Sequence, residues 1–104
     1  MATYSYTMNT SGVSPAIIQN SQSASFQMFA KQPEDSVLGN VTFQIITTSA
    51  SSGTVQITFD GSNWTDIYTF TSTGSESEIL VYEGKLKDFR LNVTSGNVTL
   101  KGMI

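Results

Sequence analysis

The chain has 104 residues with eight acidic and five basic side chains, so one domain with a net charge of −3 is expected, and no nucleic-acid partner. It contains neither cysteine nor histidine, which excludes disulfides, thiolate nucleophiles, zinc–sulfur sites and the side chain that most often shuttles protons near neutral pH. We therefore expect a protein that is not an enzyme and needs no cofactor.

The N-terminal part begins with a strand pattern. Tyr4, Tyr6 and Met8 alternate with polar residues, which predicts a strand over residues 3–8, and a second strand is expected over residues 13–19. Residues 1–22 are less regular than the rest and are expected to form an N-terminal arm or an edge strand. The start lacks a basic leader and a long apolar run, so we expect synthesis in soluble form and no membrane partner.

The next elements are two strands separated by a loop. Alternating apolar residues predict strands over residues 24–30 and 40–47. Between them, residues 31–39 read KQPEDSVLG, a segment that has room for one helical turn after Pro33 but not for a helix that packs. We interpret this segment as a loop over one end of the domain.

Residues 53–70, GTVQITFDGSNWTDIYTF, carry the signature of a β-hairpin. We predict strands over residues 54–59 and 64–70, joined by a turn in which Asp60 and Gly61 shape the reversal and Trp64 anchors it against the core. The returning strand breaks the alternation, because Trp64, Tyr68 and Phe70 share a face with Asp66. A bulge near Asp66 or burial on both faces would resolve this.

The C-terminal part predicts three further strands, over residues 78–82, 89–94 and 98–101, with short Gly- and Ser-rich turns between them. Eight or nine short strands and no helical periodicity predict an all-β domain. We expect a single antiparallel β-sandwich of about eight strands over residues 1–104, jelly-roll or Ig-like, and without substantial helix.

Acidic side chains give two candidate sites. Asp60, Asn63 and Asp66 are close enough in sequence to suggest calcium, but a carboxylate that bonds the amides of its own turn explains them better. Glu76 and Glu78 lie on one strand face and, with Asp60, Asp66 or Glu83, could be read as a glycosidase pair. Their neighbours are small and polar, so we interpret them as solvated charges without a catalytic role and predict no metal site.

Three other features have structural readings. Lys85, Lys87 and Arg90 suggest a basic patch, but blunting an edge strand explains them better. The aromatic residues could form a sugar-stacking platform, but a domain of this size needs most of them in its core; they are Tyr4, Tyr6, Phe26, Phe29, Tyr68 and Tyr82. The Asn-x-Ser/Thr triplets are explained by composition, and we assign them no function; they begin at Asn9, Asn40, Asn63, Asn92 and Asn97.

The hairpin, followed by VYEGKLKDFRLNVTSGNVTL, resembles a pattern of small β-sandwich proteins in the virions of tailed bacteriophages. In that pattern a strand, a DG-x-x-W turn, a second strand, a Phe-Arg-Leu-x-Val strand and a Ser-Gly-x-Val-Thr-Leu hairpin follow in order, here over residues 53–100. Discoidin-like sugar-binding sandwiches have a similar turn, but this chain is short for them and lacks their cysteines. A carbohydrate-binding, tail or fibre module is therefore the alternative.

The resemblance implies a virion structural protein of the capsid decoration or cement type, made in the host cytoplasm. Such proteins bind and stabilise the shell of the major capsid protein, commonly as trimers, so we expect a homotrimer with virion proteins as partners. For the contact surface we predict the N-terminal segment and the loop before residue 40. The predicted interface residues are Tyr4, Tyr6, Pro33, Val37 and Leu38.

Overall fold

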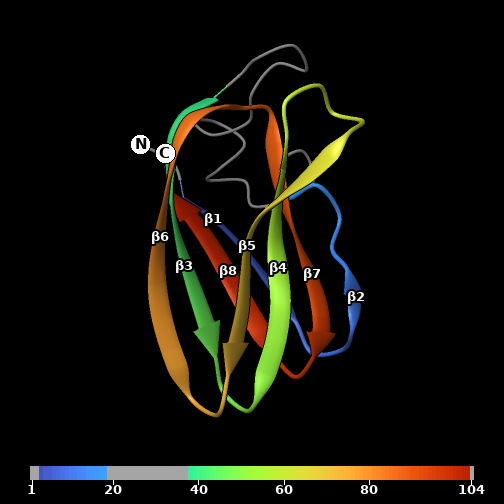
Figure 1. Ribbon diagram of the computed structural model, residues 1–104, viewed down its shortest axis with the longest axis vertical. Helices are drawn as coiled ribbons and strands as arrows, with labels where there is room; N and C mark the ends of the chain where they lie inside the picture. Colours follow the sequence, from blue (N-terminus) through green and yellow to red (C-terminus); the bar gives the residue numbers. More distant parts are fainter. Residues whose placement is uncertain (1–2, 19–37, 104) are drawn as a thin grey trace.

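The computed structural model describes residues 3–18 and 38–103, and these form two four-stranded antiparallel sheets packed face to face (Figure 1). The first sheet contains β1 (Thr3–Met8), β8 (Val98–Met103), β3 (Leu38–Thr47) and β6 (Glu76–Leu86), in that order. The second contains β2 (Gly12–Val13), β7 (Asp88–Ser95), β4 (Ser51–Thr58) and β5 (Trp64–Ser72). The predicted all-β sandwich of about eight strands is confirmed.

The strand order is that of a jelly roll. Strands pair as β1 with β8, β2 with β7, β3 with β6 and β4 with β5, so the chain follows one long antiparallel hairpin that is rolled up. The tip of this hairpin is the turn between β4 and β5, which holds Asp60. Of the two sandwich types that the sequence left open, the jelly roll is therefore the one that forms.

The core lies between the sheets and is filled by alternate residues of each strand. In β4, for example, Val55 is fully buried while its neighbours Thr54 and Gln56 are half-buried on the outer side. Phe89 lies at the centre, with its ring edge-on to Phe43 at 4.9 Å and to Tyr4 at 6.1 Å between ring centroids. These three rings join the two sheets, because β1 and β3 belong to one and β7 to the other.

The predicted irregularity in β5 is a bulge. Val55 pairs with Tyr68, but the next residue of β4, Gln56, pairs with Asp66, so Ile67 is the extra residue. The bulge lets Tyr68 and Phe70 face the core while Asp66 faces outward, which explains the broken alternation. The predicted bulge near Asp66 is confirmed.

The strand predicted over residues 13–19 is shorter than expected. Only β2 is strand, although the following residues stay attached to β7: the Ser14 amide donates to the Leu91 carbonyl at 2.8 Å and the Ile17 amide to the Phe89 carbonyl at 2.9 Å. The buried carboxylate of Asp88 accepts from the Ile18 amide at 2.8 Å. The strand predicted over residues 24–30 and most of the loop at 31–39 lie outside the described residues.

The remaining strands occur where the alternation predicts them, with ends that extend by up to four residues. The bends joining β3 to β4, β5 to β6 and β7 to β8 gather at one end of the sandwich, and the β4–β5 turn lies at the other (Figure 1). β6 and β1 are the two edges of the first sheet, and β5 and β2 are those of the second.

Candidate interaction surfaces

The outward side of the first sheet is the most distinctive surface of the described chain, and we call it the outer face. The register aligns its side chains in three rows across the four strands. In order β1, β8, β3, β6, the rows are Thr3–Met103–Thr42–Val81, Ser5–Lys101–Gln44–Ile79 and Thr7–Thr99–Ile46–Ser77. Hydroxyl-bearing and apolar residues therefore dominate this face.

Large apolar side chains on the outer face are open to solvent. Ile79 is 61% exposed, Val81 56% and Met103 44%, and Ile79 and Val81 occupy adjacent rows of the edge strand β6. Between Ile79 and Met103 the face is hollowed, with a volume of about 140 Å³, and the hollow is lined largely by apolar surface with Gln44 and Lys101 at its margins. Exposed apolar residues grouped around a shallow hollow are typical of a protein-binding surface.

The charge of the outer face differs from that of the whole chain. Lys101 is the only ionisable residue in the three rows, whereas the chain has a net charge of −3. The Gln44 side-chain amide links the second row to the third by donating to the Ser77 hydroxyl at 3.0 Å, and within the third row the hydroxyls of Thr7 and Thr99 lie 2.8 Å apart. A weakly positive and otherwise neutral face is suited to a partner surface that is neutral or acidic.

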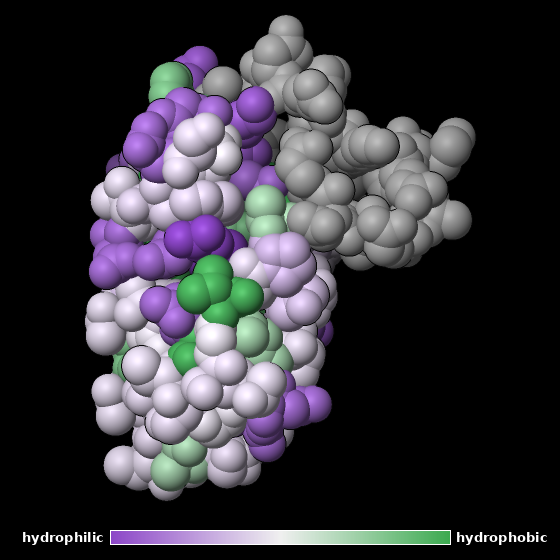
Figure 2. All heavy atoms as spheres, turned by 90° about the vertical axis from the view of Figure 1, so that its right-hand side faces the viewer, coloured by the Kyte–Doolittle hydropathy of each residue, from purple (hydrophilic) through white to green (hydrophobic). Residues whose placement is uncertain are grey.

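The side of the molecule on which β2 lies gives a contrast. Figure 2 shows this side as mainly pale, the colour of residues of intermediate hydropathy, with one compact apolar area. Val13 of β2 is 51% exposed, and Asn92, its partner on β7, is half-buried. A single exposed valine is ordinary for a protein surface.

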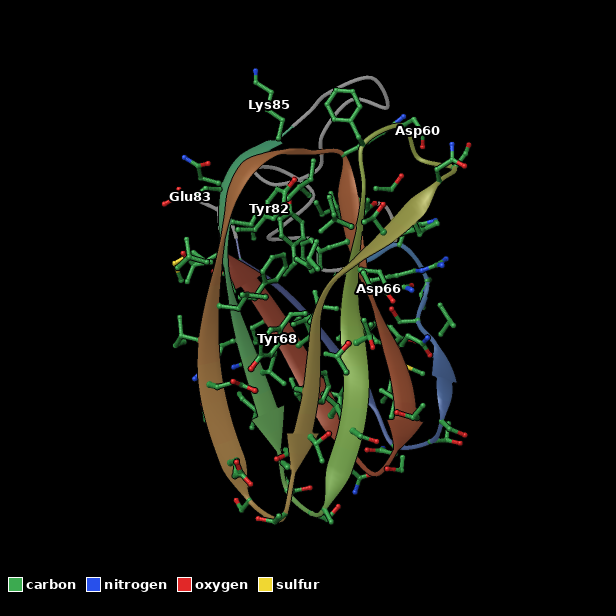
Figure 3. The ribbon with its side chains drawn as sticks, viewed as in Figure 1. Asp60, Asp66, Tyr68, Tyr82, Glu83 and Lys85 are labelled. Carbon is green, nitrogen blue, oxygen red and sulfur yellow. The ribbon has the colours of Figure 1, made fainter. Side chains whose placement is uncertain are left out.

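The open edge between the sheets holds the predicted carboxylate pair. Glu78 on β6 accepts a hydrogen bond from the Tyr68 hydroxyl on β5 at 2.6 Å, and this contact bridges the two sheets. Glu76 accepts from the Thr73 amide at 2.8 Å and so closes the β5–β6 bend. Figure 3 shows Tyr68 directed inward from β5, and the hydrogen bond to Glu78 raises the pKa of its phenol.

The two glutamates line a polar hollow of about 210 Å³ together with Tyr68 and Phe70. The expectation that only small and polar residues surround them is therefore wrong, since the rolled-up chain brings β5 against β6. Both carboxylates are nevertheless solvent-exposed and have structural partners. Among the described residues, no group of three or more acidic side chains is placed to hold a metal ion.

The Asp60 turn is held together by its own hydrogen bonds. Asp60 Oδ1 accepts from the amides of Ser62 and Asn63, each at 2.8 Å, and Oδ2 accepts from the Asn63 side chain at 2.6 Å. These donors, the Asn63 amide most of all, hold the pKa of the Asp60 carboxyl well below its usual range. Gly61 has φ +87°, a conformation that favours glycine. Both oxygens of Asp60 thus serve the turn, as the structural reading predicts.

Trp64 does not anchor this turn against the core, which corrects the prediction. The returning strand places Trp64 on the outward side of the second sheet, where the Arg90 guanidinium lies 4.2 Å from the ring centroid. Arg90 Nε donates to Gln56 Oε1 at 2.7 Å, and Gln56 Nε2 donates to Asp66 Oδ1 at 2.7 Å. Asp66, Gln56, Arg90 and Trp64 form a polar row across β5, β4 and β7, which we call the Trp64 row. Arg90 is therefore not part of a basic patch with Lys85, which points outward from the C-terminal end of β6 (Figure 3).

The predicted interface residues have different positions. Tyr4 is 1% exposed and contacts Phe89, so the expectation that it meets a partner is wrong: its ring is part of the core. Tyr6 is half-buried and packs against the same core. Pro33 and Val37 lie outside the described residues, and Leu38 begins β3.

The outer face was not predicted from the sequence. Its signal is the run Ile79-Leu80-Val81-Tyr82, in which apolar residues fill both alternating sets of one strand. A sandwich strand has only one core side, so one set had to face outward. The structure assigns Leu80 and Tyr82 to the core side and leaves Ile79 and Val81 on the surface.

No protein-family model, curated protein or solved structure matches this chain. No helix among the described residues is long and apolar enough to cross a membrane.

Proposed function

We propose that this protein is a non-enzymatic virion structural protein, of the kind that decorates and cements the capsid of a tailed bacteriophage. The observation that carries the proposal is the outer face: exposed Ile79, Val81 and Met103 in rows of hydroxyl-bearing residues, with Lys101 as the one charge. Its chemistry suits broad contact with another protein surface, and the resemblance over residues 53–100 supports the choice of a phage shell.

In the proposed mechanism the protein stabilises the shell by adding protein–protein contacts and catalyses no reaction. The protein binds the assembled major capsid protein through the outer face and adds contacts across subunit boundaries. The rigid jelly roll needs no rearrangement to present this face, because the three rows are fixed by strand pairing. Several copies held together multiply the strength of binding.

Co-sedimentation with virions that lack the protein tests the proposal. Wild-type protein should bind and should raise the temperature at which the shells break, whereas Lys101→Glu should weaken binding at least about tenfold, because it reverses the one charge within the three rows. The matched control is Lys87→Glu, an equal charge change beside the Asp60 turn. Shells of equal robustness with and without the protein would rule out the cement function.

A carbohydrate-binding module is the second candidate, and the Trp64 row is the observation that favours it. Arg90 and Gln56 present planar hydrogen-bonding groups beside an indole ring, which is the chemistry that recognises sugar hydroxyls. Binding on a glycan array that Trp64→Ala abolishes would support this candidate. A silent array, together with shell binding that Trp64→Ala leaves intact, would exclude it.

A further inference from the structure

The edge strand β6 is the longest of the eight described strands, and none of the others pairs with its second side. It spans 11 residues, Glu76–Leu86, and within the described residues it hydrogen-bonds to β3 alone. An edge strand exposes backbone N–H and C=O groups that can pair with another chain, and proteins usually guard such edges with bulges, charges or short length.

Two of the other edges are guarded, since β2 has two residues and β5 carries the bulge at Ile67. β1 is regular like the central part of β6, but its outward residues are all hydroxyl-bearing, whereas β6 carries the exposed apolar pair Ile79 and Val81. The irregularity between β3 and β6 lies beyond Tyr82, so the stretch from Glu76 to Tyr82 is regular and ready to accept a neighbour.

We propose that two copies of this protein associate through β6, edge to edge and antiparallel about a two-fold axis, to form one continuous eight-stranded sheet. The central residues of β6 are complementary to the same residues of a second copy that runs antiparallel. When Leu80 faces Leu80 of the second copy, Ile79 lies opposite Val81 of that copy, and Val81 lies opposite its Ile79. The four exposed apolar side chains then form one cluster on the outer face at the join.

The same register avoids opposing charges of like sign. It places Glu76 opposite Gly84, Ser77 opposite Glu83, and Glu78 opposite Tyr82 of the second copy. Figure 3 shows Glu83 and Lys85 pointing outward from β6 and Tyr82 pointing inward, and these two charged residues lie on the C-terminal side of the apolar centre. Glu78 does not block the approach, because its carboxylate is held toward β5 by the Tyr68 hydroxyl.

Neighbouring registers are poorer. A register shifted one way puts Ile79 opposite Glu83 and keeps only Val81 opposite Val81, and one shifted the other way puts Val81 opposite Ser77 and keeps only Ile79 opposite Ile79. Each replaces two opposed apolar pairs by one, so the apolar pattern favours the alignment on Leu80.

The pairing also extends the proposed function, although it does not depend on it. The two outer faces become parts of one sheet and point the same way, so a dimer offers two copies of the same binding surface side by side. Two contacts on one particle are bivalent, and dissociation then requires both to break.

The pairing is tested by measuring the mass of the purified protein in solution, by light scattering and by sedimentation equilibrium. We expect twice the 11.3 kDa of one chain, in place of the threefold mass of the homotrimer that the resemblance implies. Val81→Lys should raise the dimer dissociation constant at least about tenfold, because it puts an ammonium group into the apolar cluster. Val13→Lys is the matched control, an equally exposed valine on β2, and should leave the dimer intact. A monomeric or trimeric wild type, or a Val81→Lys protein that still dimerises as tightly, would overturn the proposal.

Disulfide trapping tests the register, since the chain has no cysteine of its own. Oxidising a mixture of Ile79→Cys and Val81→Cys proteins should give mainly the mixed disulfide. Lys101→Cys, two strands away from the edge on the same face, should stay reduced. Homodimers of Val81→Cys or of Ile79→Cys in place of the mixed product would refute this register. Because both β6 positions are exposed, the variants should keep the wild-type melting temperature, and that measurement separates loss of pairing from loss of folding.

Discussion

Gly102 of β8 is where packing between the two sheets leaves no room for even one methyl group. A Cβ added there would lie 2.6 Å from Phe89 Cζ and 3.1 Å from Phe89 Cε1. The Phe89 ring is fully buried and is held edge-on by Phe43 and Tyr4, so it has no free space into which to move. We therefore predict that Gly102→Ala destabilises the protein although it adds a better strand former.

The magnitude follows from two opposing terms. Overpacking a dense core costs about 1–3 kcal/mol. Replacing glycine lowers the entropy of the unfolded chain and returns about 0.4–1 kcal/mol. The net loss should be about 1–2 kcal/mol, which for a domain of this size lowers the melting temperature by roughly 4–16 °C.

Urea unfolding followed by tryptophan fluorescence measures this loss as a lower midpoint with an unchanged slope. Gly74→Ala is the control, because nothing lies within 4 Å of its added Cβ, and its stability should stay within about 0.5 kcal/mol of wild type. Phe89→Leu in the Gly102→Ala background should cost less than it does alone, because the shorter side chain relieves the clash. A Gly102→Ala protein as stable as wild type would refute the close packing of Gly102 on Phe89.

Three further predictions concern polar groups. Asp88→Ala should lower the free energy of unfolding by about 2 kcal/mol or more, because it leaves the buried amides of Ile18 and Phe89 without their carboxylate acceptor. An unchanged melting temperature in calorimetry would contradict this prediction. The pKa of Asp60 is lowered by folding, so its ionised form stabilises the fold above about pH 4, and that stabilisation is lost as the pH falls. The difference in unfolding free energy between wild type and Asp60→Asn should therefore shrink in acid. A difference that does not depend on pH would argue against the turn contacts. Tyr68 has a raised pKa, so Tyr68→Phe should remove a component that ionises above the ordinary tyrosine range from an ultraviolet titration of the tyrosines, and Glu78→Gln should move that component to lower pH. A titration that neither variant changes would contradict the bridge between the sheets.

The two proposals share Ile79 and Val81 of one sheet. Shell binding uses the whole outer face with Lys101, whereas pairing uses the free side of β6 and these two residues. Val81→Lys should therefore weaken both functions, whereas Lys101→Glu, on β8, should weaken shell binding and leave the dimer intact. If the protein forms dimers but does not bind particles, the dimer proposal is supported and the cement function is ruled out.

Local sequence chemistry predicted the elements well. The two-residue alternation marked the strands, and the broken alternation around Asp66 marked the bulge that the register shows. The Asp60–Gly61 turn followed from side-chain chemistry within four residues, which needs no tertiary contact. Such features depend on neighbours in the chain, and these are visible in the sequence.

Errors arose where a residue's surroundings come from distant strands. Tyr4 was expected at a contact surface, but the first strand pairs with the last and its inward side closes the core over Phe89. Trp64 was expected in the core, but the register of β4 and β5 places it outward, beneath Arg90. In both cases an aromatic side chain could be buried or exposed, and strand pairing determined which face of the sheet it occupies.

The sequence by itself determined that this chain is an all-β domain without thiol or imidazole chemistry, folded around a hairpin whose turn is self-sufficient. Only the tertiary structure decided that the sandwich is a jelly roll, that Ile79 and Val81 lie on its surface, and that β6 has no neighbour on one side among the described strands. The physical reason is that alternation fixes which residues share a side of a strand, whereas long-range pairing fixes which side meets the core and which strand has no neighbour.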